Sequence, residues 1–104
     1  MTAPRFAPKS FCVDPKRFGR FEDPGWVDAR QYSGDTLDQF MASGMQNKVA
    51  VAMRSAIKAK YRTADRYADA VGIDLTRLGR LLCGTVVMRL EDVANARRNL
   101  GVRL

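Results

Sequence analysis

The chain has 104 residues, of which 46% are apolar and 28% are charged, and its formal net charge at pH 7 is +7. This length suits one domain with a single core, and no apolar run in the sequence is long enough to span a bilayer. The first ten residues lack the continuous apolar stretch of a secretion signal, so we expect a cytoplasmic protein.

The residue types that usually carry catalysis or bind metals are missing or scattered. The chain has no histidine, and its two cysteines, Cys12 and Cys83, are 71 positions apart. A zinc site, a Cys-His nucleophile and a disulfide in a reducing compartment are therefore not expected. Neither nucleotide-binding pattern, GxxxxGK[ST] or GxGxxG, occurs. We predict that the protein is not an enzyme and uses no metal or cofactor, and we interpret Cys83 as a half-buried residue at a helix end.

Residues 1–34 differ in composition from the rest and are predicted to form an extended N-terminal arm. All four prolines lie before residue 25, and seven of the nine aromatic residues lie before residue 41. The prolines oppose a long helix, whereas the aromatic enrichment opposes disorder. We therefore expect the rings to dock on their own domain, on a second subunit or on another protein.

Within the arm, the sequence Asp23-Pro24-Gly25 is compatible with two structures. Asp23 could cap a short helix that has Pro24 in its first turn. Alternatively, the three residues could form the turn of a hairpin between residues 17–21 and 26–30. Of these two structures we favour the helix.

From Asp35 onward the pattern becomes helical. A short helix is expected to begin at Asp35 and to end at Gly44, and Ser43 with Gln46 then matches a capping box for a second helix that runs to about residue 61. One face of this second helix is apolar at helical spacing: Met45, Val49, Met53, Ala56 and Ile57. The opposite face is basic: Lys48, Arg54, Lys58 and Lys60. We interpret the apolar face as core, although methionine-rich faces also form adaptable binding grooves and basic amphipathic helices also bind anionic membranes.

The stretch from Thr63 to Gly84 is predicted to form two short helices joined by a tight turn. Thr63 is a favourable cap for the first helix, and Gly72 can end that helix in the left-handed conformation. Asp74 can cap the second helix, which covers about residues 75–83. The apolar residues that are expected to face inward are Tyr67, Ala68, Val71, Leu78, Leu81 and Leu82.

A connection over residues 85–88 is followed by a last predicted helix, Arg89 to Asn99. The helical spacing predicts that Leu90, Val93 and Leu100 are buried. Acidic residues lie in the first turn of this helix and basic residues in its last turn, which suits the helix dipole, and a glycine follows.

Taken together, this spacing resembles the helix-turn-helix family that includes phage lambda repressor, Cro and other XRE-type regulators. The residues that carry the resemblance are Thr63, Ala68, Gly72, Ile73, Asp74, Leu78, Leu81 and Gly84, followed by Leu90, Val93 and Leu100. The matching part runs from near Gln46 to the end of the chain. The resemblance implies an all-α fold, with a compact helix-turn-helix DNA-binding domain of four to five helices over residues 35–104. The second helix of the motif would enter the major groove.

The resemblance also implies roles for residues on and beside that second helix. Base contacts are expected from its exposed side: Leu75, Thr76, Arg77 and Arg80. Arginine suits this role because it can donate two hydrogen bonds to guanine, although each arginine could instead be a solvated surface residue. Phosphate contacts are expected from the start of the first helix and the loop beyond the second: Arg62, Thr63, Arg66 and Thr85. Ala64 and Cys83 stand where many relatives have polar residues that contact DNA.

The positive charge of the chain lies in its second half. Residues 1–47 contain six basic and six acidic side chains, whereas residues 48–104 contain twelve basic and five acidic side chains. A basic surface beside a groove-reading helix suits double-stranded DNA as a partner, although a basic surface alone would also serve solubility.

We therefore expect a sequence-specific DNA-binding transcriptional regulator, a repressor of phage or mobile-element type. One alternative is an antitoxin that binds a toxin through the N-terminal arm and autoregulates its operon; another is a helical core that makes only protein contacts. A homodimer is expected, because the chain stops before the dimerisation helix of many relatives and begins with an aromatic-rich segment. Phe18, Phe21 and Trp26 are the expected anchors of that dimer, unless the arm folds back on its own subunit.

Overall fold

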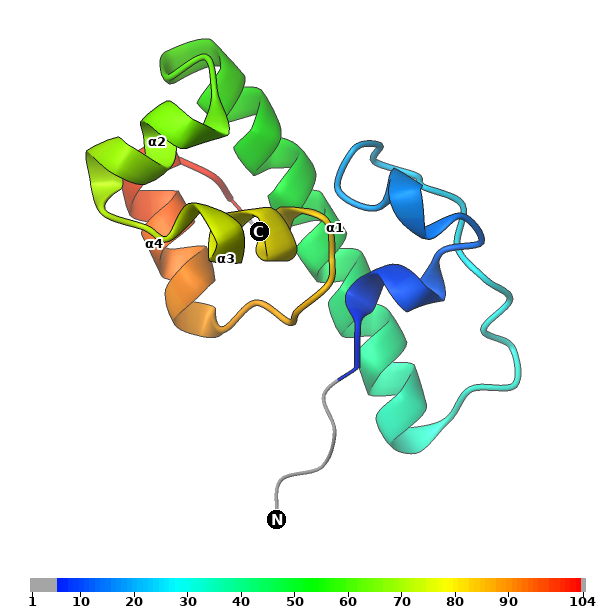
Figure 1. Cartoon of the computed structure of the whole chain (residues 1–104). Coiled ribbons are helices and arrows are strands. Elements are labelled where there is room, and N and C mark those ends of the chain that lie inside the picture. Colours follow the sequence, from blue (N-terminus) through cyan, green and yellow to red (C-terminus); the bar gives the residue numbers. More distant parts are fainter. Residues whose placement is uncertain (1–5, 104) are drawn as a thin grey trace.

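The computed structural model describes residues 6–103, and its longest element is the helix α1, Gly34–Lys60, along which the other segments pack (Figure 1). The helix begins after Ser33, whose carbonyl oxygen accepts a hydrogen bond from the Leu37 N–H, and it ends at Tyr61. At that end the N–H of Arg62 donates to the carbonyl oxygen of Ile57 (2.9 Å). Arg62 has a φ of +71°, the left-handed conformation that commonly closes a helix.

The predicted break between two helices near Gly44 is wrong, because α1 continues through it. The hydroxyl of Ser43 donates to the carbonyl oxygen of Gln39 (2.7 Å) instead of capping a helix. A glycine inside a helix costs only about 1 kcal/mol relative to alanine, which tertiary packing readily outweighs. Met45, predicted to be core, is also 56% exposed, whereas Val49 and Met53 are buried as predicted.

Two short helices follow, as the sequence predicted. They are α2, Ala64–Val71, and α3, Leu75–Leu82, joined by the turn Gly72-Ile73-Asp74. Each begins with a side-chain cap: Thr63 Oγ1 accepts from the Arg66 N–H (3.3 Å), and the Asp74 carboxylate accepts from the Arg77 N–H (3.2 Å). The glycine that ends α2 has a φ of +72°, as expected.

The last helix, α4, covers Leu90–Leu100, which is close to the predicted range, and ends at a glycine with a φ of +71°. Leu100 is buried and Val93 packs against the core, as predicted. The predicted burial of Leu90 is wrong, since its side chain is 83% exposed. Leu90 is the first residue of α4 and follows a connection without helical structure, so the helical periodicity used to place it does not yet hold there.

The described part of the N-terminal arm contains two short 3-10 helices, η1, Pro8–Phe11, and η2, Pro15–Arg17, each of which starts with a proline. The expected helix at Asp23-Pro24-Gly25 is wrong. Those residues form a turn in which the Gly25 N–H donates to the Asp23 carboxylate (3.0 Å), and Gly25 has a φ of +84°. The predicted hairpin between residues 17–21 and 26–30 does not form either. Trp26 pairs instead with Cys12, in an isolated antiparallel bridge.

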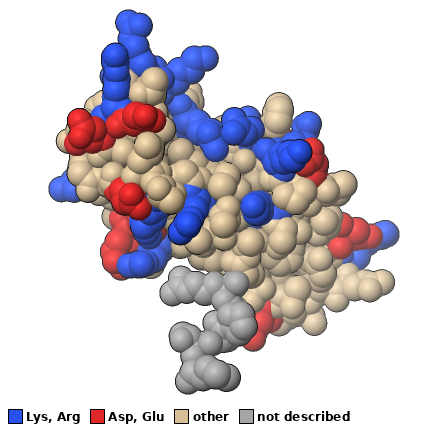
Figure 2. Space-filling model, viewed as in Figure 1, with Lys and Arg blue, Asp and Glu red and all other residues tan. Residues whose placement is uncertain are grey.

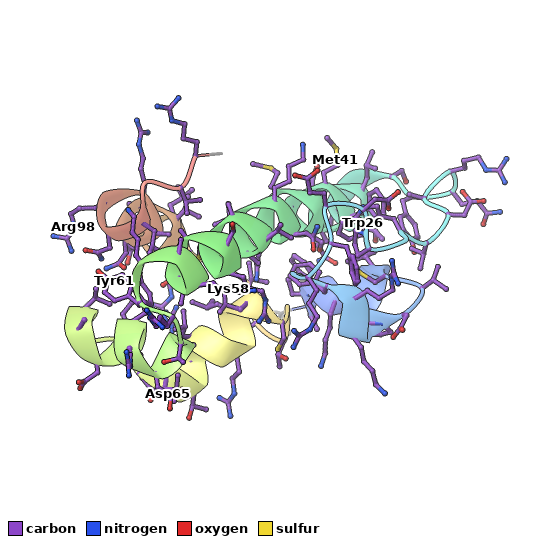
Figure 3. The ribbon with its side chains drawn as sticks, turned by 90° about the horizontal axis from the view of Figure 1, so that it is seen from above. Trp26, Met41, Lys58, Tyr61, Asp65 and Arg98 are labelled. Atoms are coloured by element: carbon purple, nitrogen blue, oxygen red, sulfur yellow. The ribbon has the colours of Figure 1, made fainter. Side chains whose placement is uncertain are left out.

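The arm packs on its own subunit through aromatic rings. Phe18 is 1% exposed and belongs to the same core as the buried faces of α1 and α3. The ring of Trp26 lies edge-on to those of Phe18 (6.3 Å between centroids) and Phe40 on α1 (5.9 Å), and Figure 3 shows it between the arm and α1. Phe18 is therefore buried in its own subunit, and Trp26 is partly buried there. Of the three expected anchors, only Phe21 is exposed, at 47%.

Two consecutive polar residues of α1 hold the segments on either side of it. The amide of Gln46 donates to the carbonyl oxygens of Leu81 (3.0 Å) and Val86 (2.9 Å) and accepts from the Met88 N–H (2.8 Å). The fully buried amide of Asn47 bonds the arm: it accepts from the Gly19 N–H (2.6 Å) and donates to carbonyl oxygens of residues 21 and 22. One turn of α1 thus fixes the connection after α3 with one side chain and the arm with the next.

Within residues 6–103 the regular structure is helical, as the sequence predicted, apart from the single bridge in the arm. None of the helices in that range combines the length and the apolar composition needed to cross a membrane.

Candidate functional site

Helix α3 has one buried face and one face open to solvent. Its buried face consists of Leu78, Leu81 and Leu82, each at most 4% exposed, as predicted. On the other side, Thr76 and Arg80 are exposed, and Leu75 is 43% exposed. The three leucines and the Asp74 cap hold the helix against α1 and α2, so the exposed side chains project from a rigid support.

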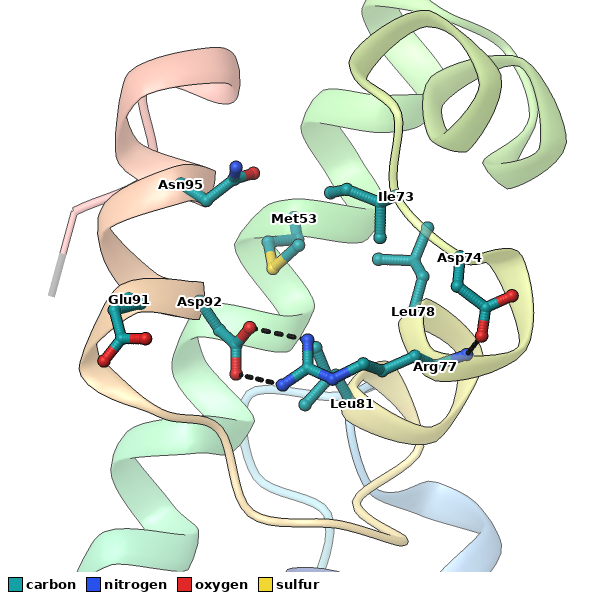
Figure 4. A pocket seen from close by; sticks show the side chains of 9 residues that line it. All are labelled: Met53, Ile73, Asp74, Arg77, Leu78, Leu81, Glu91, Asp92 and Asn95. Atoms are coloured by element: carbon teal, nitrogen blue, oxygen red, sulfur yellow. Dashed lines mark hydrogen bonds and ion pairs between the residues drawn. The ribbon is translucent and has the colours of Figure 1, made fainter.

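Arg77, one of the two expected base-reading arginines, is paired within the protein. Its guanidinium donates two parallel hydrogen bonds to the Asp92 carboxylate of α4, at 2.6 and 2.8 Å (Figure 4). The two side chains are 35% and 15% exposed, respectively. They lie beside a cavity of about 330 Å³ between α1, α3 and α4, lined also by Met53 and Asn95. Arg77 therefore links α3 to α4, and contact with a base would require this pair to open.

The electrostatics of Asp92 reflect this pairing. Burial by itself raises the pKa of its carboxyl group, but hydrogen bonds from Arg77 and from the Arg89 N–H stabilise the carboxylate and outweigh burial. The net effect is a pKa below the ordinary value for aspartate. The carboxylate thus stays charged and paired at neutral pH.

The residues expected to contact phosphate lie at two places. Arg62, Thr63 and Arg66 are exposed around the start of α2. Thr85 is exposed beyond the end of α3, where its hydroxyl lies 3.1 Å from the sulfur of Cys83. Cys83 is half-buried at the end of α3, as predicted.

The basic side chains form a visible pattern on one face of the molecule. Figure 2 shows lysine and arginine in a band along the upper edge of that face, which runs from the end of α1 towards the η2 segment. The band therefore includes part of the N-terminal arm, which the sequence analysis treated as uncharged overall.

The sequence analysis missed three basic residues of the arm that lie near the end of α3. Lys9, Lys16 and Arg20 line a cavity of about 450 Å³ together with Cys83. The net charge of residues 1–47 is zero because acidic residues elsewhere in this range balance these three cations, so the net charge gave no sign of a local basic cluster. The signal that could have revealed them is the spacing of basic residues between positions 9 and 20, a range that contains a single acidic residue, Asp14.

Comparisons of the chain with protein-family models, with curated proteins and with solved structures find no match.

Proposed function

We propose that the protein binds double-stranded DNA by inserting α3 into the major groove, and that it acts as a transcriptional regulator of the lambda-repressor-like helix-turn-helix type, a repressor. The observation that carries the proposal is the exposed face of α3. It presents an apolar, a hydroxyl and a guanidinium side chain from a helix that is capped at its start and anchored by three buried leucines. These are the groups that contact thymine methyls, bases and guanine in major-groove recognition.

The proposed base contacts come from Leu75, Thr76 and Arg80. Arg80 is the main reader, since it is exposed and makes neither a side-chain hydrogen bond nor an ion pair with any residue in 6–103. Arg77 instead sets the position of α3 relative to α4 through Asp92.

The proposed phosphate contacts come from the residues that flank α3 in space. Arg62, Thr63 and Arg66 surround the start of α2, where free backbone N–H groups favour an anion, and Thr85 lies on the connection after α3. Contacts of this kind position a protein on DNA without reading the sequence.

The test is selection of bound fragments from a random library of double-stranded oligonucleotides, followed by titration of the enriched sequence at several salt concentrations. We expect one enriched motif and a log–log salt slope on the order of −0.9 per neutralised phosphate. Arg80→Ala should lose preference for the motif, whereas Lys58→Ala, a change of an exposed cation on α1, serves as the matched control. Absence of enrichment together with salt-independent binding would count against DNA as the ligand.

The second candidate is the antitoxin, which was predicted to bind a toxin through the N-terminal arm; the observation that favours it lies instead on α1, just after the arm. Met41 and Met45, one turn apart on α1, are 59% and 56% exposed, and Figure 3 shows Met41 on the outer side of the helix. Exposed methionines suit an adaptable protein contact. If the chain is an antitoxin, the product of an adjacent small reading frame should co-purify with it, and Met41→Lys with Met45→Lys should abolish this co-purification without affecting DNA binding. Co-purification that survives both changes would exclude this surface as the toxin contact.

A further inference from the structure

The arm and the end of α3 form a cationic pocket whose lining comes from segments distant in sequence. Lys9, Lys16 and Arg20 of the arm line it together with Cys83, the residue that ends α3. The segments are joined directly, because the Lys9 N–H donates to the carbonyl oxygen of Gly84 (3.0 Å). Gly84 has a φ of +76°, and a Cβ added to it would lie 2.6 Å from the Phe18 ring. The arm and the end of α3 are therefore closely packed at this contact. The pocket is therefore a fixed part of the fold.

A fourth cation, Arg54 of α1, is subject to the charges of two residues that line this pocket, Arg20 and Cys83. Its Nε atom is buried and has no hydrogen-bond partner within residues 6–103. Burial lowers the pKa of Arg54, and the positive charge of Arg20 lowers it further, while Cys83 opposes this effect. The Arg54 guanidinium thus has a positively charged neighbour, Arg20, and a buried donor without a partner in residues 6–103.

The acidic residues of the described chain do not neutralise this cluster. The ion pairs in residues 6–103 are Arg30 with Asp28 and Arg77 with Asp92, and both involve other residues. Asp14, two residues before Lys16, accepts a hydrogen bond from the backbone N–H of Lys16 rather than from its ammonium group. A cluster of unneutralised cations with an unused buried donor is expected to attract an anion with several acceptor oxygens.

We propose that this pocket, lined by Lys9, Lys16 and Arg20, binds a phosphate group of the DNA backbone next to the segment read by α3. The inference rests on the proposed DNA-binding function and extends it, because it makes the N-terminal arm part of the DNA-binding surface. DNA is the expected source of the phosphate, since the pocket adjoins the end of α3 and the connection that carries Thr85. Duplex DNA that contacts the exposed face of α3 would pass this edge of the molecule.

The first experiment measures the salt dependence of DNA binding for Lys16→Gln, Arg20→Gln and the double variant. The double variant should reduce the magnitude of the log–log salt slope by about 0.9, the value for one phosphate contact, and each single change should reduce it by less. Arg98→Gln is the matched control, because it removes an equally exposed arginine that Figure 3 shows pointing away from the arm. Wild-type slopes in the double variant would overturn the pocket assignment and leave the proposed function standing. Wild-type protein that binds no DNA would overturn both.

The second experiment uses Cys83 as a reporter of pocket occupancy. Cys83 is half-buried in the pocket lining, whereas Cys12 is 3% exposed, so alkylation by iodoacetamide followed by mass spectrometry separates the two thiols. Duplex DNA should slow alkylation of Cys83, and Arg20→Gln should reduce that protection. Inorganic phosphate at the same phosphate concentration and ionic strength should give little protection. Equal protection by inorganic phosphate would overturn DNA as the source, and no protection by either would overturn the site.

Discussion

At the scale of single residues, Arg77 and Arg80 lie nearly one turn apart on α3 but have different surroundings. Arg77→Ala removes two charge-assisted hydrogen bonds and leaves the half-buried Asp92 carboxylate without its main partner. We expect it to lower the free energy of unfolding by roughly 1–3 kcal/mol. Arg80→Ala should change stability by less than about 0.5 kcal/mol, as is usual for exposed residues, and should weaken specific DNA binding by roughly 1–3 kcal/mol.

Urea unfolding and DNA titration of both variants check this division of roles. A double-mutant cycle with Asp92→Ala isolates the energy of the Arg77–Asp92 pair. Equal loss of stability in the Arg77 and Arg80 variants would contradict the structural role assigned to Arg77.

The pairing of Asp92 also predicts a pH dependence of stability. Its pKa is lower in the folded protein than in the unfolded chain, where it is about 3.9. The folded state therefore gains stability from the carboxylate above that unfolded value, and loses it as the pH falls through the folded pKa. Accordingly, the stability difference between wild type and Asp92→Asn should be largest near pH 7 and should shrink below about pH 4. A difference that is constant from pH 7 to pH 3 would be inconsistent with this account.

Arg62 adopts the left-handed backbone conformation, which is unfavourable for residues other than glycine. Its φ of +71° at the end of α1 costs a residue with a side chain about 1 kcal/mol, which glycine avoids. Arg62→Gly should therefore stabilise the protein, but by less than about 1 kcal/mol, because glycine also raises the entropy of the unfolded chain. It should weaken DNA binding, because the proposed phosphate contact is lost. Thermal unfolding measures the first effect, with Arg62→Ala as the control that removes only the charge. A lower midpoint for Arg62→Gly than for Arg62→Ala would contradict this explanation.

At the scale of elements, α1 organises the fold through adjacent amide side chains that face different segments. Asn47→Ala would leave the Gly19 N–H without a partner in a buried site, and two carbonyl oxygens of the arm without this partner in a part-buried one. We expect a loss of roughly 2–4 kcal/mol in the free energy of unfolding, since each unsatisfied buried group costs about 1–3 kcal/mol. Ser55→Ala, at an exposed position of the same helix, should have little effect.

Amide hydrogen exchange can localise the effect of Asn47→Ala. Protection should fall first at the Gly19 N–H and its neighbours in the arm, before it falls in α2 and α3. Loss of protection that begins in α3 would show that Asn47 stabilises a different part of the fold.

At the scale of the whole molecule, the proposed DNA binding still predicts a homodimer through the arm, but with only one of the three expected anchors, Phe21, exposed there. The subunit measures 42 × 33 × 21 Å, which is comparable to one turn of the duplex, about 34 Å, the usual separation of half-sites. Phe18 is part of the core, so removal of residues 1–34 would disrupt folding as well as assembly. The exposed apolar side chains of the described arm are Val13, at 74%, and Phe21, at 47%.

We predict that Val13→Glu combined with Phe21→Ser converts a dimer into a monomer without unfolding the subunit. Mass measured by light scattering over a range of concentrations, free and on DNA, provides the test, and Val86→Ser on the connection after α3 provides the control. A double variant that remains dimeric would exclude the arm as the interface. A wild-type protein that is monomeric both free and on DNA would exclude the dimer.

The sequence by itself determined the parts of this protein that depend on neighbours within about four residues. The bounds of α2 and α3 followed from Thr63, Asp74 and Gly72, because a cap satisfies backbone groups in the adjacent turn. The buried leucines of α3 followed from helical periodicity for the same reason. The proline-rich composition likewise indicated that the arm contains no long helix, and the arm has two 3-10 helices that begin at prolines.

Only the tertiary structure decided the contacts between segments distant in the chain. Gln46, predicted as part of a helix cap, instead bonds the end of α3 and the connection after it, 35 to 42 residues away, and α1 continues through the expected break. Arg77 resembled a free base reader until Asp92, 15 residues later, was placed beside it. Phe18 was predicted to anchor a second subunit, but it is buried in the core of its own subunit. These outcomes depend on which segments pack together, since the energy of burying a ring or pairing a charge is set by partners that local sequence patterns do not specify.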